Sequence, residues 1–113
     1  MRAEALKGHL DGLLLSILEP GPTHGYALIE ALKANSGGQF DLPTGTVYPA
    51  LRRLEAAGLV QSTWSDDPGR PRRTYELTRK GRDQLQQRRK EWSDFSTAVT
   101  TVLTGGAAWN PAT

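Results

Sequence analysis

The sequence predicts a mainly helical fold with a small β-hairpin, an α+β class in which three short helices, the hairpin and one long helix follow in that order. Three observations support this prediction. Apolar residues recur every three or four positions in the first half of the chain, alternate with polar residues over 72–78, and recur every seven positions after residue 85. These spacings are typical of amphipathic helices, of a half-buried strand and of a helix that packs against another helix, respectively.

The first predicted helix is an apolar run that two prolines end. Its apolar residues lie at helical spacing: Leu6, Leu10, Leu13, Leu14, Ile17 and Leu18. Pro20 and Pro22 follow the run, and proline cannot continue a helix because it has no backbone N–H to donate.

A second helix is expected to begin at Thr23, whose hydroxyl can accept a backbone hydrogen bond as an N-cap. The pair Gly37-Gly38 ends this helix, since glycines at such positions break the helical pattern. Its expected core residues are Tyr26, Ile29, Leu32 and, as a further candidate, Leu28.

The run from 44 to 57 predicts a third helix with Val47, Leu51 and Leu54 on one stripe. Gly58 follows where helices often end in a left-handed glycine. Pro49 lies inside the run, so we expect either that the helix begins after Thr44 or that its first turns are distorted.

The hairpin is predicted from two β-forming segments, 59–65 and 72–78, with turn residues at 66–71 between them. In the second segment Tyr75 and Leu77 lie on one face. Thr78 can then cap a last helix, although position 81 is glycine where a capping box has Glu or Gln.

The last helix carries an apolar seam that requires a partner. Its residues repeat at heptad-like spacing: Leu85, Trp92 and Val99, interleaved with Phe95 and Val102. The segment from Gly105 to Thr113 contains two glycines and a proline, so we expect a flexible tail.

Composition excludes several classes of protein. The chain has 113 residues, which suits one compact domain, and it has no cysteine. Disulfides, thiolate catalysis and cysteine metal sites are therefore excluded, and a reducing cytoplasm is compatible with the sequence. The apolar run 10–18 is too short to span a bilayer, and no signal-peptide cleavage pattern follows it. We expect a cytoplasmic protein that does not enter a membrane.

Positive charge is concentrated between Arg70 and Lys90, although the formal net charge is only +2. Nine residues of this stretch are basic, and only Glu76 and Asp83 are acidic. Such a stripe is the electrostatic footprint of a polyanion binder. A solvated helix face would have the same composition, so both interpretations remain open.

The residues do not suggest catalysis or a cofactor. His9 and His24 are the only histidines, and the adjacent carboxylates Asp66 and Asp67 lie in a turn, so no pair of nucleophile and base can be assembled. A metal site formed by His9, Asp11 and His24 is an alternative without a recognised ligand spacing. We expect no enzyme activity, no cofactor and no bound metal.

The order of three helices and a basic hairpin is that of a winged helix-turn-helix domain, in which the third helix enters the DNA major groove, about 12 Å wide, and the hairpin reaches the flanking backbone. Hydroxyl and guanidinium groups donate to phosphate oxygens and guanine edges. Tyr48 could instead be a core aromatic residue, and Arg52 or Arg53 could meet phosphate or only solvent. The candidate DNA-binding residues are Thr44, Thr46, Tyr48, Arg52 and Arg53 on the third helix, and Arg70, Arg72 and Arg73 on the hairpin.

Five stretches of the sequence resemble the PadR family of transcriptional regulators. They are Leu6-Lys7-Gly8-His9-Leu10-Asp11, His24-Gly25-Tyr26, the run from Gly45 to Glu55, Gly58-Leu59-Val60, and Arg73-Thr74-Tyr75-Glu76-Leu77-Thr78 with Gly81. The string Gly45-Thr46-Val47-Tyr48-Pro49-Ala50-Leu51 is the specific one, and the family pattern has proline at position 49. The resemblance covers about residues 6 to 103.

The resemblance implies a homodimer that represses transcription and that a small-molecule effector releases from double-stranded DNA. A twofold dimer implies a palindromic operator with two inverted half-sites about one helical turn apart. In the compact subgroup that this chain resembles, one C-terminal helix packs against the first helix of the partner. The implied organisation is a winged helix-turn-helix domain at 1–78, a dimerisation helix at 79–104 and a flexible tail at 105–113.

Trp92 matches the position at which some multidrug-sensing relatives carry a tryptophan that stacks on flat aromatic ligands. As a structural residue of the dimer seam, Trp92 would contribute about 2 to 3 kcal/mol by burial and need no ligand. This structural role and a ligand-binding role both remain open. As a sensor, Trp92 would line an effector cleft between the two protomers together with Phe95, Val99, Leu10, Asp11 and Leu14.

A protein-interaction adaptor is the competing function, because winged helix domains also bind other proteins. Such an adaptor would be expected to have a neutral hairpin and third helix, whereas both carry arginines here. Ionic strength discriminates between the two functions. Affinity for duplex DNA falls steeply as salt increases, whereas an apolar protein contact changes little.

Overall fold

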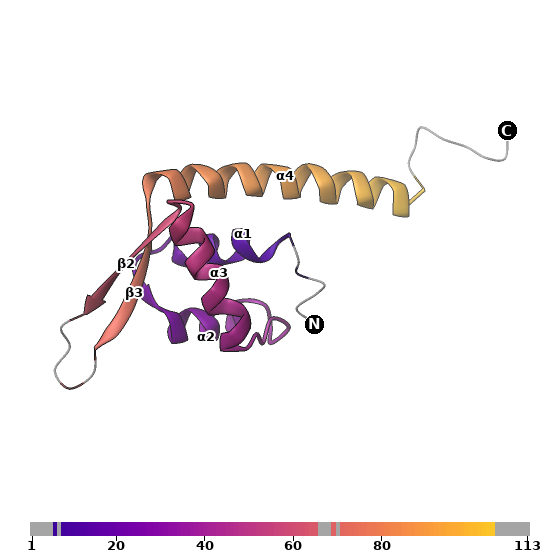
Figure 1. The fold of residues 1–113 in the computed structure, drawn as a ribbon. Helices are drawn as coiled ribbons and strands as arrows, with labels where there is room; N and C mark the ends of the chain where they lie inside the picture. The colour runs from indigo at the N-terminus through magenta and orange to yellow at the C-terminus, as the bar shows by residue number, and fades with distance from the viewer. Residues whose placement is uncertain (1–5, 7, 66–68, 70, 106–113) are drawn as a thin grey trace, which may run out of the picture.

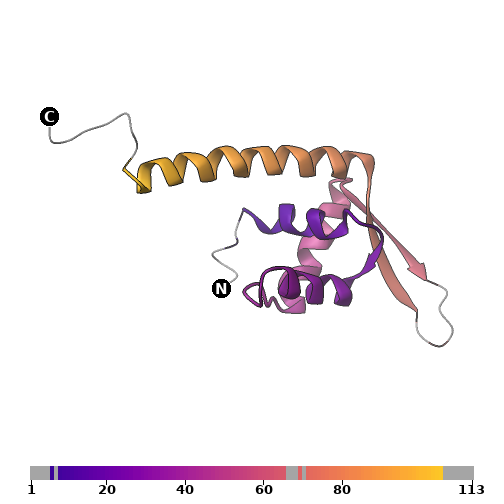
Figure 2. The ribbon, with the colours of Figure 1, turned by 180° about the vertical axis from the view of Figure 1, so that it is seen from behind.

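The computed structural model describes residues 6, 8–65, 69 and 71–105. A body of three short helices carries the hairpin on one side, and a long helix crosses the body and continues past it (Figures 1 and 2). This order confirms the predicted fold class, a winged helix-turn-helix domain followed by a long helix. The elements are α1 (Leu10–Leu18), β1 (Thr23–His24), α2 (Gly25–Asn35), α3 (Thr44–Ala56), β2 (Val60–Ser65), β3 (Arg72–Leu77) and α4 (Arg79–Leu103).

One hydrophobic core holds these elements together. All four helices and the hairpin contribute to it, and burial of each large aliphatic side chain is worth roughly 1.5–3 kcal/mol. The fully buried large side chains are Leu14, Leu15, Leu18, Leu28, Leu51, Leu54, Leu85, Val47 and Val60.

The first helix is shorter than predicted. Leu6 is buried in the core but lies in a separate turn, in which the His9 N–H donates to the Leu6 carbonyl (2.8 Å). Gly8 has a φ of +88°, outside the helical region, so the helix begins only at Leu10. A core leucine at helical spacing was therefore mistaken for a helical residue.

The start of α2 also differs from the prediction. Thr23 is not a helix cap: it lies in β1, opposite Tyr75 of β3, and His24 occupies the N-cap position. Tyr26 is 67% exposed and does not belong to the core, whereas Leu28 is fully buried. The sheet thus has three strands in the order β1-β3-β2, one more than the predicted hairpin.

Helix α3 continues through Pro49 from Thr44 to Ala56, so the expectation of a later start is wrong. The Pro43 carbonyl accepts hydrogen bonds from the N–H groups of the third and fourth helical residues. Pro49 is close to this end, and its missing N–H deprives only the carbonyl of Gly45, which lies in the exposed first turn. Water can satisfy that carbonyl, which is why the proline is tolerated.

The end of α3 is joined to the start of α4. Gly58 has a φ of +77°, confirming the predicted glycine C-cap. The Thr78 N–H donates to the Leu59 carbonyl (3.1 Å), and its hydroxyl donates to the Gly58 carbonyl (2.6 Å). The same hydroxyl accepts from the Gly81 N–H (3.0 Å), as expected of an N-cap, and Lys80 Nζ donates to the C-cap carbonyl of α3 (2.9 Å). The orientation of α3 is therefore tied directly to that of α4.

The buried residues of α4, Gly81 and Leu85, both lie in its first half. Leu85 is buried against the core. Arg88 Nη1 donates to the carbonyl of Gly8, which precedes α1 in the sequence (3.1 Å). A 25-residue helix is about 37 Å long, and its second half extends beyond α1 (Figure 2). None of the helices in the described part of the chain has the length and apolarity to cross a bilayer.

Candidate nucleic-acid interface and the adjoining cavity

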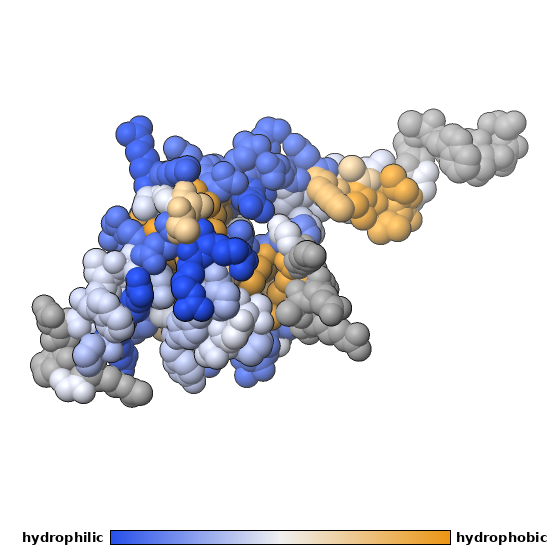
Figure 3. Space-filling view, in the orientation of Figure 1, coloured by the Kyte–Doolittle hydropathy of each residue, from blue (hydrophilic) through white to orange (hydrophobic). Residues whose placement is uncertain are grey.

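The outer face of α3 carries the residues that the sequence analysis assigned to DNA. Because Val47, Ala50, Leu51 and Leu54 point into the core, Thr44, Arg52 and Arg53 are exposed and Thr46 and Tyr48 are half-buried. Strongly hydrophilic surface lies over the middle of α3 in Figure 3, and the surface over its N-terminal end is close to neutral. The Arg52 side chain has no hydrogen bond or ion pair with any residue that the structure describes.

Tyr48 is held against the start of α2. A Cβ at position 25 would overlap the Tyr48 ring and lie 2.9 Å from its hydroxyl oxygen, so only glycine allows this approach. The two interpretations of Tyr48 therefore both describe part of its environment: the ring packs on Gly25, and the residue still lines a surface groove. The close approach also explains the glycine in the His24-Gly25-Tyr26 string.

This groove has a volume of about 550 Å³ and runs between the start of α2, α3 and β3. It brings two hairpin arginines to the same place as three tyrosines. Burial raises the pKa of the Tyr75 phenol above its usual value, so this group stays neutral at physiological pH. The groove is lined by His24, Gly25, Tyr26, Ala27, Tyr48, Arg72, Arg73 and Tyr75. The apolar spacing of α2 assigned Tyr26 to the core, so its place in this groove was not predicted.

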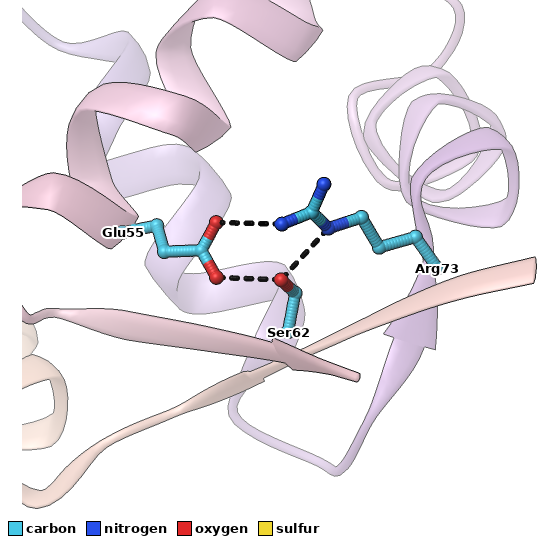
Figure 4. Close-up of polar contacts among 3 residues, drawn as sticks. All are labelled: Glu55, Ser62 and Arg73. Carbon is cyan, nitrogen blue, oxygen red and sulfur yellow. Dashed lines mark hydrogen bonds and ion pairs between the residues drawn. The ribbon is translucent and has the colours of Figure 1, made fainter. Parts of the chain in front are cut away.

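A polar network joins the hairpin to α3 (Figure 4). Arg73 Nε donates to Ser62 Oγ (2.8 Å), and Arg73 Nη2 lies 3.4 Å from Glu55 Oε1. Ser62 Oγ in turn donates to Glu55 Oε2 (2.5 Å). The guanidinium carbon of Arg73 also lies 5.8 Å from the centre of the Trp64 ring, a cation–π distance. The hairpin is thus held to α3 by charge as well as by the core.

The arginines assigned to DNA differ in their surroundings. Arg53 Nη2 lies 3.5 Å from Asp11 Oδ1 of α1, so a predicted DNA residue meets a predicted effector residue. Arg72 is exposed, and its side chain has no hydrogen bond or ion pair within the described ranges. Arg70 lies outside the described residues, as does the tail from residue 106 onward.

A larger cavity of about 730 Å³ lies between α1, α4 and the loop before α3. Of the residues predicted to line an effector cleft between protomers, Trp92 and Phe95 line this cavity of the single chain, whereas Leu10, Asp11 and Val99 do not. Leu14 is fully buried in the core and is not accessible to a ligand in this conformation, so its assignment to the cleft is corrected. The complete lining is Leu6, Gly8, His9, Gly12, Leu13, Ser16, Phe40, Arg88, Arg89, Glu91, Trp92 and Phe95.

Most of the lining residues were not predicted, and two of these carry aromatic rings. The His9 ring meets Trp92 edge-on, with 5.2 Å between ring centroids, and Phe40 reaches the cavity from the segment before α3. Neither has a periodic signal, since both lie outside helices. At the far wall Arg89 makes two hydrogen bonds to Glu19 (3.0 and 2.9 Å), and these bonds hold the pKa of the Glu19 carboxyl below its usual value.

The second half of α4 exposes an apolar face. Its apolar side chains are between 40% and 78% exposed, and the far end of α4 forms the apolar patch of Figure 3. These residues are Trp92, Phe95, Val99, Val102 and Leu103. The face includes every seam residue that the heptad spacing predicted except Leu85, which packs into the core of its own chain.

The alternative metal site is not assembled. Within the described part of the chain, no three His, Asp or Glu residues gather in a way that could hold a metal ion. His9 faces Trp92, Asp11 faces Arg53, and the His24 ring lies 3.4 Å from the Thr74 hydroxyl.

Comparison with known proteins agrees with the fold and the sequence motifs. The transcriptional regulator Rv3488 of Mycobacterium tuberculosis is 36% identical over 76 residues, covering 67% of this chain and 68% of that protein. A PadR-like transcriptional regulator of Bacillus cereus superposes with a TM-score of 0.79 at 31% identity, over 91% of this chain and 99% of the other. Bacillus subtilis PadR, solved in complex with operator DNA, superposes with a TM-score of 0.64 at 22% identity, over 70% of this chain and 45% of the other.

The chain spans between 20% and 68% of the length of the curated relatives it matches. The family model described as "Transcriptional regulator PadR-like family" matches residues 14–87, from the first helix to the middle of α4. This match covers more than half of the chain and includes the Gly45-Thr46-Val47-Tyr48-Pro49 string. The chain therefore belongs to the PadR-like family, a family of transcriptional regulators and not of enzymes, as the resemblance predicted.

Proposed function

We propose that this chain is a sequence-specific DNA-binding transcriptional regulator in which α3 reads the major groove. The observation that carries the proposal is the exposed outer face of α3, where the Arg52 side chain has no described partner. Tyr48 of the same helix lines a groove together with Arg72. A guanidinium without an internal partner can bind phosphate or a guanine edge without first breaking a protein contact. The fold is similar to that of Bacillus subtilis PadR, which was solved in complex with operator DNA, and this similarity supports DNA binding by the present chain.

The second part of the proposal is a homodimer formed through the exposed face of α4. Five large apolar side chains on one helix face, none fully covered by their own chain, would be costly to leave in water. A second copy of the chain is the fitting partner because heptad-like spacing lets the same face pair with itself. In this assembly residues 1–78 bind DNA and residues 79–104 dimerise, so the operator would contain two inverted half-sites.

The third part is repression that a small molecule relieves by binding in the larger cavity. Its volume of about 730 Å³ lies within the range of small-molecule sites, roughly 300–1,000 Å³. Trp92, Phe95, Phe40 and His9 provide aromatic rings, so a flat aromatic compound is the expected ligand. Trp92 and Phe95 belong to both the cavity and the dimer face, which would let a ligand change the dimer geometry.

Fluorescence anisotropy of a labelled random duplex at 50 to 200 mM salt tests the DNA-binding function. The affinity of the wild-type protein should fall steeply with salt, by about 0.9 in the logarithmic slope for each phosphate that is neutralised. Arg52→Ala should weaken binding, whereas Arg82→Ala, which removes the same charge from exposed α4, should change it little. Binding that is absent at 50 mM salt, or that salt does not change, would contradict the proposal.

Sedimentation velocity tests the dimer, and fluorescence quenching by a planar dye such as acridine tests the cavity. Trp92→Ala should lower the dimer fraction and the affinity for the dye. Trp64→Ala is a matched control, because Trp64 is also exposed but lies on the hairpin. If both variants sediment and bind the dye like the wild type, α4 is neither the dimer face nor a wall of the ligand site.

A further inference from the structure

Neighbouring arginines on β3 point to opposite faces of the hairpin. Side chains alternate along a strand, so Arg73 shares a face with Tyr75 and Leu77, both of which are buried. Trp64 of β2 is the cross-strand partner of Arg73 and lies on that inner face. Arg72 occupies the other face and is exposed. The two arginines therefore have different environments although they are adjacent in the sequence.

The donors of Arg73 are already engaged inside the protein. Its guanidinium bonds to Ser62, pairs with Glu55 and lies over the Trp64 ring, as Figure 4 shows for the first two contacts. If Arg73 turned to a DNA phosphate, these contacts would break and the Glu55 carboxylate would remain unpaired next to a polyanion. The pair is partly exposed, so these losses, at most about 1 kcal/mol for the ion pair, would offset part of the electrostatic gain from the phosphate.

Both arginines line the groove with Tyr48 and Tyr26, so the difference between them lies in their partners. Arg72 has no ion pair with a described residue, so a phosphate would be its first anionic partner there. A phosphate bound by Arg72 adds a charge-assisted contact and releases a counterion from DNA.

We propose that Arg72 and Arg73 have different roles in the β2–β3 hairpin. This proposal rests on the proposed DNA-binding function. Glu55 and Arg73 are positioning residues that fix the hairpin at a set angle to α3. Of the two arginines, Arg72 is the one that contacts the DNA backbone. This assignment replaces the expectation that Arg72 and Arg73 act alike.

Three variants test these roles, one by removing contacts at constant net charge and two by removing a positive charge. Glu55→Gln/Arg73→Gln removes the tether without changing the net charge, Arg72→Gln removes one positive charge from the wing, and Arg82→Gln removes one from α4 as a control. Binding of a labelled duplex is measured from 50 to 200 mM salt. Hydrogen exchange of the β2–β3 segment is measured in the free proteins.

Arg72→Gln should reduce the salt slope by about 0.9 for each wing that meets DNA. The ratio of wild-type to variant affinity should then shrink about 3.5-fold per wing between 50 and 200 mM salt. The tether variant should bind several-fold more weakly by the same ratio at every salt concentration, and its hairpin should exchange faster. Arg82→Gln should leave both the slope and the exchange close to wild type.

The outcomes distinguish failure of this inference from failure of the proposed function. If the tether variant loses slope as Arg72→Gln does, Arg73 is a phosphate contact and the division of roles is wrong. Unchanged hairpin exchange in the tether variant would equally overturn the positioning role. If the wild type shows no salt-dependent binding, the proposed function fails and the role of Arg72 fails with it, while hydrogen exchange in the free protein still decides the role of Glu55 and Arg73.

Discussion

Substitution of Gly81 by alanine is predicted to destabilise the protein, although the same change usually stabilises a helix. Gly81 lies in the first turn of α4, where a Cβ would overlap the Leu59 carbonyl oxygen and approach its carbonyl carbon to 3.0 Å. That carbonyl belongs to the backbone and accepts the Thr78 N–H, so it cannot move without loss of the junction between α3 and α4.

The magnitude follows from three contributions. Alanine gains about 1 kcal/mol over glycine inside a helix. Overpacking against a backbone atom costs about 1–3 kcal/mol, and each lost hydrogen bond of the Thr78 cap costs about 1 kcal/mol. The net effect of Gly81→Ala is a loss of about 2 kcal/mol, equivalent to a Tm lower by about 8 °C for a domain of this size.

Urea and thermal denaturation followed by circular dichroism measure this effect at fixed protein concentration. Gly12→Ala is the matched control: Gly12 is also helical, but its Cβ would meet only the Arg88 side chain at an ordinary 3.5 Å. The control should be stabilised by about 0.5–1 kcal/mol. If Gly81→Ala is as stable as Gly12→Ala, α4 does not approach the Leu59 carbonyl as closely as described. That result would contradict the claim that the orientation of α3 is tied to that of α4.

Further predictions concern the DNA face and the ion pairs of α1. Gly25→Ala should displace the Tyr48 ring and weaken duplex binding in an anisotropy titration, while the circular dichroism spectrum stays helical. Asp11→Asn should raise duplex affinity by up to about 5-fold, since the carboxylate competes with phosphate for Arg53 and an exposed pair is worth at most about 1 kcal/mol; unchanged or lower affinity would contradict this. Glu19→Gln removes an equal charge from the other end of α1 and should leave DNA affinity unchanged. Because the pKa of Glu19 is lowered in the folded state, its ion pair stabilises near neutral pH and is lost as the pH falls through that lowered value; melting curves of Glu19→Gln and wild type should therefore converge in acid.

The elements with a long period or a strong terminator could be predicted from the sequence. The stripe of Val47, Leu51 and Leu54 identified α3, and Gly58 and Thr78 marked its end and the start of α4. These signals are local, because each depends on backbone hydrogen bonds or on one helix face.

Features that depend on tertiary contacts could not be predicted in this way. Strand β1 has only two residues and exists because β3 offers it an edge, so no periodicity reveals it. Leu6 keeps helical spacing but is separated from α1 by Gly8, whose backbone conformation the apolar pattern does not encode.

The sequence predicted a set of residues for the candidate site, but not which acidic residues pair with its arginines. The sequence placed Arg53 and Arg73 on the DNA face, yet it could not indicate that Asp11 and Glu55 lie beside them. The members of each pair are 42 and 18 positions apart in the sequence. Only the packing of α1 on α3 and of the hairpin on α3 brings them together.

Selection of bound duplexes from a random pool by the purified protein tests the central claim most directly. A twofold dimer with α3 in the major groove should enrich two inverted half-sites with centres about one helical turn, roughly 34–36 Å, apart. Enrichment of a single half-site would contradict the dimer, and a pool that stays random after repeated selection would contradict sequence-specific reading by α3.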